Sequence, residues 1–274
     1  MEFNGLYVVA TPIGNMNDLS PRALEVLAGV SFVAAEDTRN TGTMLSRLGI
    51  KKELVSYHAH NIAAKSDYII SRIEAGESAA LVSDAGTPAI SDPGEELVRE
   101  CHKRGVRVTP VPGPSAVITA ISASGMPTGR FTFEGFLSTA VNSRRKHLES
   151  LKDEKRTMVF YEAPHRLKKT LSDMFEVFGD RKIVLARELT KFYEEIITTT
   201  FAEALKLYDT KDPLGEFVII VDGKKEEKPA LDEDEAKRLF EGFLKEGLSK
   251  KDAVKKVAEA TGLSKNGLYD LLIK

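Results

Sequence analysis

Short apolar runs alternate with helical patterns through the first 111 residues, and this alternation constrains the fold more than any other feature. Helical patterns separate the runs, and one of them begins with Ser20 as an N-cap and Pro21 at the first helical position. Alternation of this kind favours βαβ units around a parallel sheet. The strand-like runs are Leu6–Ala10, Val30–Ala35, Leu54–Tyr57, Ser78–Val82 and Val106–Val111.

The second half of the chain has its own set of strand-like runs. These are Phe131–Phe136, Thr157–Tyr161, Ile183–Arg187, Glu194–Thr200 and Phe217–Val221. The last two have little sequence between them, which favours a mixed or antiparallel sheet. A Gly113-Pro114 turn and a helix of small residues separate the two sets of strands. We therefore predict an α/β protein with a parallel-sheet domain at residues 1–114 and a mixed-sheet domain at 115–223.

The composition changes after Val221. A charged segment ends at Pro229, and three helical patterns follow at Asp232–Glu246, Ser249–Thr261 and Ser264–Ile273. The turn between the last two resembles a helix-turn-helix. The final 26 residues carry six lysines against three acidic residues. We predict that residues 224–274 form a linker and a small helical domain. Contact with nucleic acid and packing against a partner both remain open.

The composition limits the environment in which this chain works. Cys101 is the single cysteine, so an internal disulfide is excluded, and its helical pattern marks it as a core residue. No apolar run approaches the ~20 residues that span a bilayer, and no signal peptide is recognisable. We therefore expect a cytoplasmic protein without membrane contact. The formal charge of −2 restricts any RNA-binding surface to a local patch.

Three of the predicted strands end in loops that are rich in Gly and Pro, at residues 10–15, 82–94 and 111–116. Ligands of open α/β sheets bind beyond the carboxyl ends of the strands, where small residues let the backbone approach them closely. An ordinary strand-to-helix loop is the alternative for any one of the three. A Gly-x-Gly-x-x-Gly motif and a P-loop are both missing, which excludes those phosphate sites. The loops thus predict a crevice for a compact ligand with polar ends.

Five motifs in this order and at natural spacing carry a family resemblance. They are Thr-Pro-Ile-Gly-Asn (11–15), Ala-Glu-Asp-Thr-Arg (35–39), Ser-Asp-Ala-Gly-Thr-Pro (83–88), Val-Pro-Gly-Pro-Ser-Ala (111–116) and Phe-Tyr-Glu-Ala-Pro-His-Arg (160–166). Together they resemble the ribosomal branch of the tetrapyrrole methylase superfamily from about residue 6 to 221, and more loosely to the C-terminus. The resemblance implies that family's two-domain fold, a homodimer and S-adenosylmethionine as methyl donor. It also implies 2′-O-methylation of a cytidine ribose in small-subunit ribosomal RNA, either free or in the assembled 30S subunit.

The same resemblance indicates which residues bind the donor, and it implies no metal. Gly86 would let the backbone approach the ligand, Asp84 would accept hydrogen bonds, and Ile90 would offer an apolar contact. Loops of the second domain would close the pocket from the other side. The donor-binding residues are therefore expected to be Pro12, Asp84, Gly86, Ile90, Ser115, Ala116, Glu162 and Leu189.

The residues that would bind and activate the methyl acceptor are predicted from polar side chains at the ends of strands. A ribose hydroxyl is a poor nucleophile, so a base or a polarising charge beside it would help. The candidate catalytic residues are Asp37, Arg39, His58 and Glu188. An internal salt bridge is the alternative for the 36–39 segment. His58 and His60 share one face, but a metal site would need a third ligand. The candidate RNA-binding residues are Arg39, His58, His60, Arg144, Arg145 and Arg166.

Two other functions compete with RNA methylation. A tetrapyrrole methylase would use the same donor pocket on a porphyrin precursor. A non-catalytic regulator would bind nucleic acid through the C-terminal helices. The appended helical domain favours RNA methylation, because a small-molecule methylase has little reason to carry one.

Overall fold

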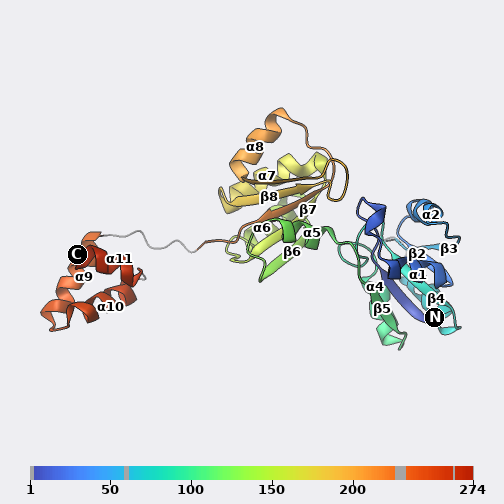
Figure 1. Cartoon of the computed structure of the whole chain (residues 1–274), viewed down its shortest axis with the longest axis horizontal. Helices are drawn as coiled ribbons and strands as arrows, with labels where there is room; N and C mark the ends of the chain where they lie inside the picture. The colour runs from blue at the N-terminus through green and yellow to red at the C-terminus, as the bar shows by residue number, and fades with distance from the viewer. Residues whose placement is uncertain (1–2, 59–61, 226–232, 262, 274) are drawn as a thin grey trace. The chain divides into compact units, whose positions relative to one another are not determined.

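The computed structural model describes residues 3–58, 62–225, 233–261 and 263–273. It divides into two compact units, an N-terminal unit, Met1–Gly223, and a C-terminal unit, Lys224–Lys274 (Figure 1). The N-terminal unit contains two five-stranded sheets, and helices cover their faces. The boundary predicted at residues 114 and 115 falls in the loop between β5 (Val108–Val111) and α5 (Ala116–Ala123), and it stays a prediction.

The first sheet is entirely parallel, as the alternation of strands and helices predicts. Its order is β3-β2-β4-β1-β5, so the N-terminal strand lies between two strands that come much later in the chain. The strands are β1 (Gly5–Val9), β2 (Phe32–Ala35), β3 (Glu53–Ser56), β4 (Ser78–Val82) and β5 (Val108–Val111). The helices are α1 (Pro21–Gly29), α2 (Thr38–Arg47), α3 (Ile62–Glu74) and α4 (Glu95–Lys103), with a short 3-10 turn, η1 (Met16–Asp18).

Helices cover both faces of this sheet, which explains why its central strands β1, β2 and β4 are almost entirely buried and apolar. Leu6 and Leu81 pack with α3 and α4 on one face, while Val9 and Val82 pack with α1 and α2 on the other. Cys101 of α4 is fully buried in this core, and burial raises the pKa of its thiol to about 11. The prediction that Cys101 is a core residue is confirmed.

The second sheet is mixed, with order β6-β7-β10-β8-β9. Only the β6–β7 pair is parallel among its pairings. Helices α6, α7 and α8 cover one face, and α5 covers the other. The strands are β6 (Phe131–Phe136), β7 (Thr157–Glu162), β8 (Lys182–Arg187), β9 (Glu195–Thr200) and β10 (Phe217–Val221). The helices are α5 (Ala116–Ala123), α6 (Val141–Ser150), α7 (Pro164–Phe178) and α8 (Phe201–Thr210).

The prediction of a mixed sheet is confirmed, but the reason given for it is wrong. Helix α8 fills the interval between β9 and β10, and β9 pairs with β8 rather than with β10. The helix is hard to recognise in the sequence because Phe201, the first residue of α8, directly follows the strand. The side chain of Thr200 caps the helix by accepting a hydrogen bond from the Glu203 amide.

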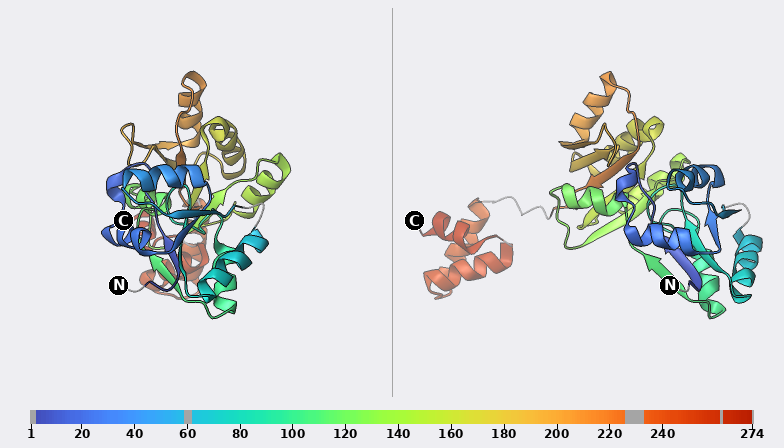
Figure 2. Two further views of the ribbon diagram at one scale, coloured as in Figure 1. Left: turned by 90° about the vertical axis from the view of Figure 1, so that its right-hand side faces the viewer. Right: turned by 45° about the vertical axis from the view of Figure 1, so that its right-hand side comes forward.

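The C-terminal unit consists of α9 (Glu233–Lys245), α10 (Lys250–Thr261) and α11 (Lys265–Leu272), drawn in red in Figure 2. Phe240, Val257 and Leu268 meet in its small apolar core. The Ser249 hydroxyl accepts a hydrogen bond from the amide of Asp252 at the start of α10. Among the described residues of the chain, we find no helix with the length and apolar character that crossing a bilayer requires.

Candidate functional site

Three loops meet at the carboxyl edge of the first sheet, because β4, β1 and β5 are neighbours in it. Thr11 and Gly86 exchange backbone hydrogen bonds of 2.8 and 3.0 Å, which joins the first loop to the second. The Thr87 hydroxyl donates to the carbonyl of Pro114 at 3.1 Å, which joins the second loop to the third. The three loops therefore lie together at one edge of the first sheet.

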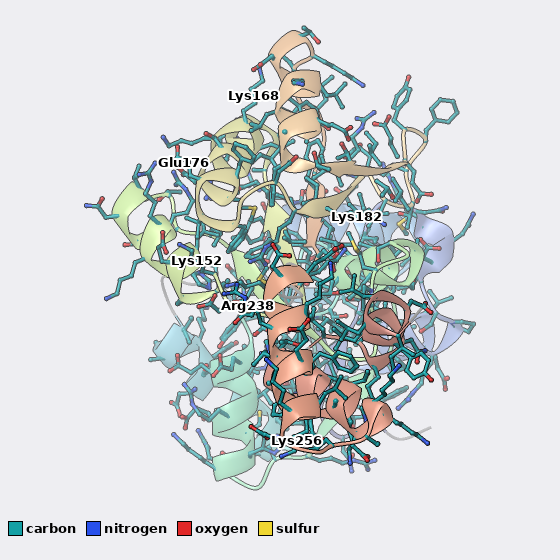
Figure 3. The ribbon with its side chains drawn as sticks, turned by 90° about the vertical axis from the view of Figure 1, so that its left-hand side faces the viewer. Lys152, Lys168, Glu176, Lys182, Arg238 and Lys256 are labelled. Atoms are coloured by element: carbon teal, nitrogen blue, oxygen red, sulfur yellow. The ribbon has the colours of Figure 1, made fainter. Side chains whose placement is uncertain are left out.

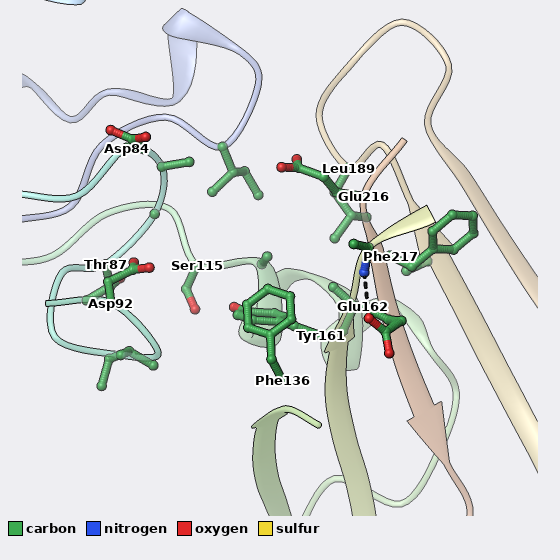
Figure 4. A pocket seen from close by; sticks show the side chains of 18 of the residues that line it. Asp84, Thr87, Asp92, Ser115, Phe136, Tyr161, Glu162, Leu189, Glu216 and Phe217 are labelled. Atoms are coloured by element: carbon green, nitrogen blue, oxygen red, sulfur yellow. Dashed lines mark hydrogen bonds between the residues drawn. The ribbon is translucent and has the colours of Figure 1, made fainter. Parts of the chain in front are cut away.

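A cavity of about 330 Å³ lies between these loops and the second sheet, as Figure 4 shows. Its size is in the range usual for small-molecule sites. Pro12 is not among the lining residues, and its neighbour Ile13 is. The other predicted donor-binding residues line the cavity, although their contact with a donor stays a prediction: Asp84, Gly86, Ile90, Ser115, Ala116, Glu162 and Leu189.

The two walls of the cavity approach each other closely at Gly14. A Cβ atom at Gly14 would lie 2.5 Å from Cγ of Lys191 and 2.9 Å from the hydroxyl of Thr190, so a side chain does not fit there. Ile13 beside it packs against the α5-covered face of the second sheet. The loop after β1 therefore connects the two halves of the N-terminal unit.

Backbone strain is concentrated around the cavity. Among the described residues, four that are not glycine have positive φ angles: Ala89 (66°), Ser91 (63°), Glu188 (50°) and Thr190 (67°). The first two lie in the loop after β4 and the other two in the loop after β8, and both loops line the cavity. Strained backbone of this kind persists where the surrounding structure enforces it, and it is common at functional sites.

Carboxylates in loops that follow strands of the first sheet make one wall of the cavity acidic. Glu36 follows β2, while Asp84 and Asp92 lie in the loop after β4. Burial raises the pKa of Asp92 to about 6, and the charges of Glu36 and Asp84 add to this, while a hydrogen bond with Ser83 opposes it. Burial also raises the pKa of Glu36, with Asp84 and Asp37 contributing. Asp84 itself is exposed at the edge of the cavity and accepts a hydrogen bond from Asn40 at 3.1 Å.

The raised pKa of Asp92 gives a stability prediction. Above pH 6 its ionised carboxylate opposes folding, because like charges and burial disfavour it, whereas near pH 4 it is protonated in the folded chain. Asp92→Asn should therefore raise Tm by about 2–5 °C at pH 7.5 and leave it nearly unchanged at pH 4. Thermal unfolding at the two pH values checks this, and an equal Tm gain at both would contradict it.

The strands and loops of the second sheet contribute an ion-pair network and two aromatic rings to the opposite wall. The Lys191 ammonium lies 2.8 Å from Glu188 and 3.1 Å from Glu216, and its hydrogen bond lowers the pKa of Glu188. Tyr161 and Phe136 contact each other with ring centroids 5.3 Å apart, and both line the cavity. Burial raises the pKa of Tyr161 to about 12, so its hydroxyl stays protonated near neutral pH.

Glu162 is fully enclosed in a local hydrogen-bond network. Its carboxylate accepts hydrogen bonds from the Ala163 amide at 2.9 Å and from the Thr170 hydroxyl, and it lies 3.3 Å from Arg166. Figure 4 shows the bond to Ala163 at the base of the cavity. The arrangement indicates that Glu162 fixes the start of α7 beside the cavity.

The four candidate catalytic residues are not brought together. Glu188 lines the cavity, whereas Asp37, Arg39 and His58 are not among its lining residues. Asp37 caps α2 and pairs with Arg39 at 2.7 Å, which is the internal salt bridge weighed above, and the hydrogen bond from Arg39 lowers the pKa of Asp37 to about 2. His58 directly follows the Tyr57 that extends β3, and His60 lies outside the described residues.

The sequence does contain signals for the residues that were missed. Glu36 belongs to the same Glu-Asp-Thr-Arg segment, one position before the candidate Asp37, and Asp92 lies in the Gly/Pro-rich loop at residues 82–94. Glu36 and Asp92 become candidate site residues only once the structure shows that both line the cavity. The described residues include no group of three or more His, Cys, Asp or Glu arranged to hold a metal ion.

Of the arginines predicted to bind RNA, Arg144 requires a correction. Its side chain is 3% exposed, and Nε donates to Asp173 at 2.7 Å while Nη1 donates to the carbonyl oxygens of Ser138 and Thr139. It is a buried structural residue and has no surface to offer to RNA. Arg145 beside it is half-exposed and pairs with Glu176.

The other basic side chains of the N-terminal unit differ in how far they are exposed to solvent. Arg166 is mostly buried and donates to the Leu137 carbonyl at 2.6 Å. Figure 3 shows the exposed Lys152, Lys168 and Lys182 of the N-terminal unit, which lie on or beside α6, α7 and β8. These lysines are better placed than Arg144 to meet a phosphate backbone.

Comparison with known proteins agrees with this architecture. Residues 5–205 match the family described as Tetrapyrrole (Corrin/Porphyrin) Methylases. The chain belongs to the tetrapyrrole methylase family. Residues 230–274 of this family member match a further domain, the RsmI C-terminal HTH domain.

Similar proteins cover nearly the whole chain. It is 49% identical to the "Ribosomal RNA small subunit methyltransferase I" of Xylella fastidiosa (strain Temecula1 / ATCC 700964), over 96% of this chain and 97% of that protein. It is 46% identical to the protein of the same name from Escherichia coli O157:H7, over 96% of this chain and 93% of the relative.

Solved methyltransferase structures share the fold at low sequence identity. The methyltransferase CobJ matches with a TM-score of 0.60 and 17% identity, over 80% of this chain and 94% of its own. A uroporphyrin-III C-methyltransferase from Thermus thermophilus, solved in complex with S-adenyl homocysteine, matches with a TM-score of 0.56 and 18% identity. That match covers 81% of this chain and 98% of the other.

Proposed function

We propose that the chain is an S-adenosylmethionine-dependent methyltransferase that methylates the 2′-oxygen of a cytidine ribose in small-subunit ribosomal RNA. The observation that carries the proposal is the match along nearly the full length of relatives named ribosomal RNA small subunit methyltransferase I, at 43–49% identity. The C-terminal domain is included in that match. The assignment of a cytidine ribose as the methyl acceptor rests on the resemblance of the five sequence motifs to the ribosomal branch of the family.

The cavity has the features that the methyl donor requires. S-adenosylmethionine supplies an activated methyl group on a positively charged sulfur. Apolar side chains of Ile13, Ile90 and Leu189 suit its adenosine and methylene groups, and the backbone around Gly86 is open to close approach. The acidic wall suits the positive charges of the donor. A solved relative of the fold binds the corresponding product, which supports the same use of this cavity.

The chain's own residues would act mainly by alignment and exclusion of water. Methyl transfer is a direct displacement, so the rate depends on holding the two reactants in line at close distance. The strained loops after β4 and β8 fix both walls of the cavity, and Tyr161 and Phe136 between them keep part of it apolar.

An exposed aromatic pair supports an RNA acceptor. Phe192 and Tyr193 are 92% and 69% exposed, and their rings contact each other at 5.0 Å in the loop that follows the cavity residue Lys191. Large aromatic side chains are rarely left so exposed, whereas unpaired RNA bases are commonly held by stacking on them. We propose that this pair stacks on a base next to the target nucleotide.

Replacing both Phe192 and Tyr193 by alanine should raise the apparent KM for RNA by about tenfold or more, since base stacking is worth about 1–3 kcal/mol per base. Donor affinity and Tm should stay near wild type, because both rings are exposed. Leu214→Ala, which removes a 68% exposed side chain from another loop, is the matched control. An unchanged KM for RNA would remove the aromatic pair from the acceptor site.

One assay tests the proposed function. Purified full-length protein is given radiolabelled S-adenosylmethionine with undermethylated small ribosomal subunits, naked small-subunit RNA or a porphyrin precursor. We expect label in the RNA, in a cytidine nucleotide whose 3′ linkage resists alkaline hydrolysis, as a 2′-O-methyl group dictates. Label in the porphyrin precursor instead would identify a tetrapyrrole methylase. Nucleic-acid binding without transfer of label would indicate a regulator.

The C-terminal unit gives a further prediction. A chain ending at Gly223 should remain folded and bind the donor as the full chain does, because the removed residues form their own compact unit. We propose that the lysines of α10 and α11 contact RNA phosphates, so truncation should raise the apparent KM for RNA and flatten its salt dependence. Methylation across a salt series compares the two chains. Equal salt slopes would show that this unit does not hold RNA.

A further inference from the structure

The cavity carries an excess of negative charge on its first-domain wall. Glu36, Asp84 and Asp92 all face it. Among the described residues that line the cavity, Lys191 is the one cation, and it is bonded to Glu188 and Glu216 on the other wall. Its charge is therefore balanced by those two carboxylates, and the first-domain wall favours a ligand that brings positive charge of its own.

The loop that carries Asp92 is strained and tightly packed. The loop around it has positive φ angles at Ala89, Ser91 and Gly94, and a Cβ atom at Gly94 would lie only 2.8 Å from Leu81. The bulge of β6 at Gly135 also approaches the Ser91 hydroxyl closely. Asp92 lines the cavity, and Figure 4 draws its carboxylate on the same side of the cavity as Asp84 and Thr87. A packed and strained loop thus holds this side chain toward the ligand space.

The groups that face Asp92 do not neutralise it. Glu36 and Asp84 are carboxylates, Ser83 supplies a neutral hydrogen bond, and Tyr161 across the cavity keeps its proton near neutral pH. Near Glu36, Asp37 and Arg39 form a surface ion pair whose charges cancel. Burial and like charge make the ionised Asp92 unfavourable until a cation is nearby, which its raised pKa reflects.

We infer that Asp92 recognises the positively charged sulfur of the methyl donor, so that the pocket binds the charged donor in preference to the neutral thioether product. This inference rests on the proposed function and adds a residue that sets ligand specificity. Donor and product share the adenosine and amino-acid groups and differ in one methyl group and one charge. Methyl transfer removes that charge, so the same carboxylate that holds the donor would favour release of the product.

The test is calorimetric binding of S-adenosylmethionine and S-adenosylhomocysteine to the full-length protein and to Asp92→Asn. At pH 7.5 we expect the substitution to weaken donor binding by about tenfold, which is about 1.4 kcal/mol. Product binding should change by less than about twofold, because the common groups of the two ligands are untouched. The donor-to-product affinity ratio should therefore fall by about tenfold.

Glu95→Gln is the matched control. This substitution removes a carboxylate three residues after Asp92. The Glu95 side chain is 83% exposed and pairs with Arg99 on α4. Its affinity ratio should equal that of wild type. An Asp92→Asn protein with an unchanged ratio overturns the inference, and so does an equal loss of affinity for both ligands. Wild-type protein that binds neither ligand would instead reject the proposed function.

Wild-type protein provides a second test that needs no variant. Asp92 is more than half protonated below its pKa of about 6, so the donor-to-product ratio should rise with pH from 5 to 7 and then level off. Donor binding at pH 5.5 should release protons, which calorimetry detects as a dependence of the heat on the buffer. A ratio that is flat across this range contradicts the inference.

Discussion

Gly86→Val is expected to weaken S-adenosylmethionine binding by more than about 100-fold. Gly86 lines the cavity, and both its amide and its carbonyl are bonded to Thr11, so the backbone cannot move away to make room. A Cβ atom there would already lie 3.4 Å from Ile13, and the two methyl groups of valine extend further into ligand space. Calorimetric titration of the donor measures the loss.

The structure also changes what this substitution does to stability. From the loop alone, a valine at position 86 would be expected to leave the fold nearly unaffected, but Gly86 has a φ angle of 80°. A β-branched residue in that region costs about 1–2 kcal/mol. Gly49→Val is the matched control, since Gly49 has a φ of 71° and nothing within 4 Å of its Cβ position. If Gly49→Val lost donor affinity equally, strain rather than occupied ligand space would explain the result.

Asp173→Ala should destabilise the N-terminal unit by about 3–5 kcal/mol, because removing one partner leaves the buried Arg144 guanidinium without its counter-charge. Both side chains are at most 5% exposed, so water cannot replace the lost carboxylate. Chemical denaturation of the full chain measures the change. Glu176→Ala should cost less than about 1 kcal/mol, because its pair with Arg145 is at the surface. Similar losses for the two variants would contradict this account.

The strands were predictable because burial on two faces requires uninterrupted apolar sequence. Ser78–Val82 and Phe217–Val221 are buried along their whole length, and both were predicted with the same bounds that the structure gives them. Their pairing was less accessible to prediction, because the sequence around β9 does not reveal that its partner is β8. Periodicity reports burial, whereas register and neighbours depend on contacts between distant segments.

The site was predictable where it depends on backbone and less so where it depends on charge. The Gly/Pro-rich loops marked the cavity because turns need those residue types. Asp92 and Arg144 show the limit, since a loop carboxylate and a helical arginine look the same in sequence whether buried or exposed. Asp92 lines the cavity and Arg144 is buried only because residues distant in the sequence pack around them.

The strand order of the second sheet has a consequence for biosynthesis. β6 and β7 form one ladder and β8 and β9 another, and only β10, the last strand made, bonds to both. Until Phe217–Val221 is synthesised, a nascent chain holds two separate ladders with apolar edges that can pair wrongly. Phe217 and Val218 of this strand also line the cavity. A chain that stops before residue 217 therefore lacks both the centre of this sheet and part of the cavity lining.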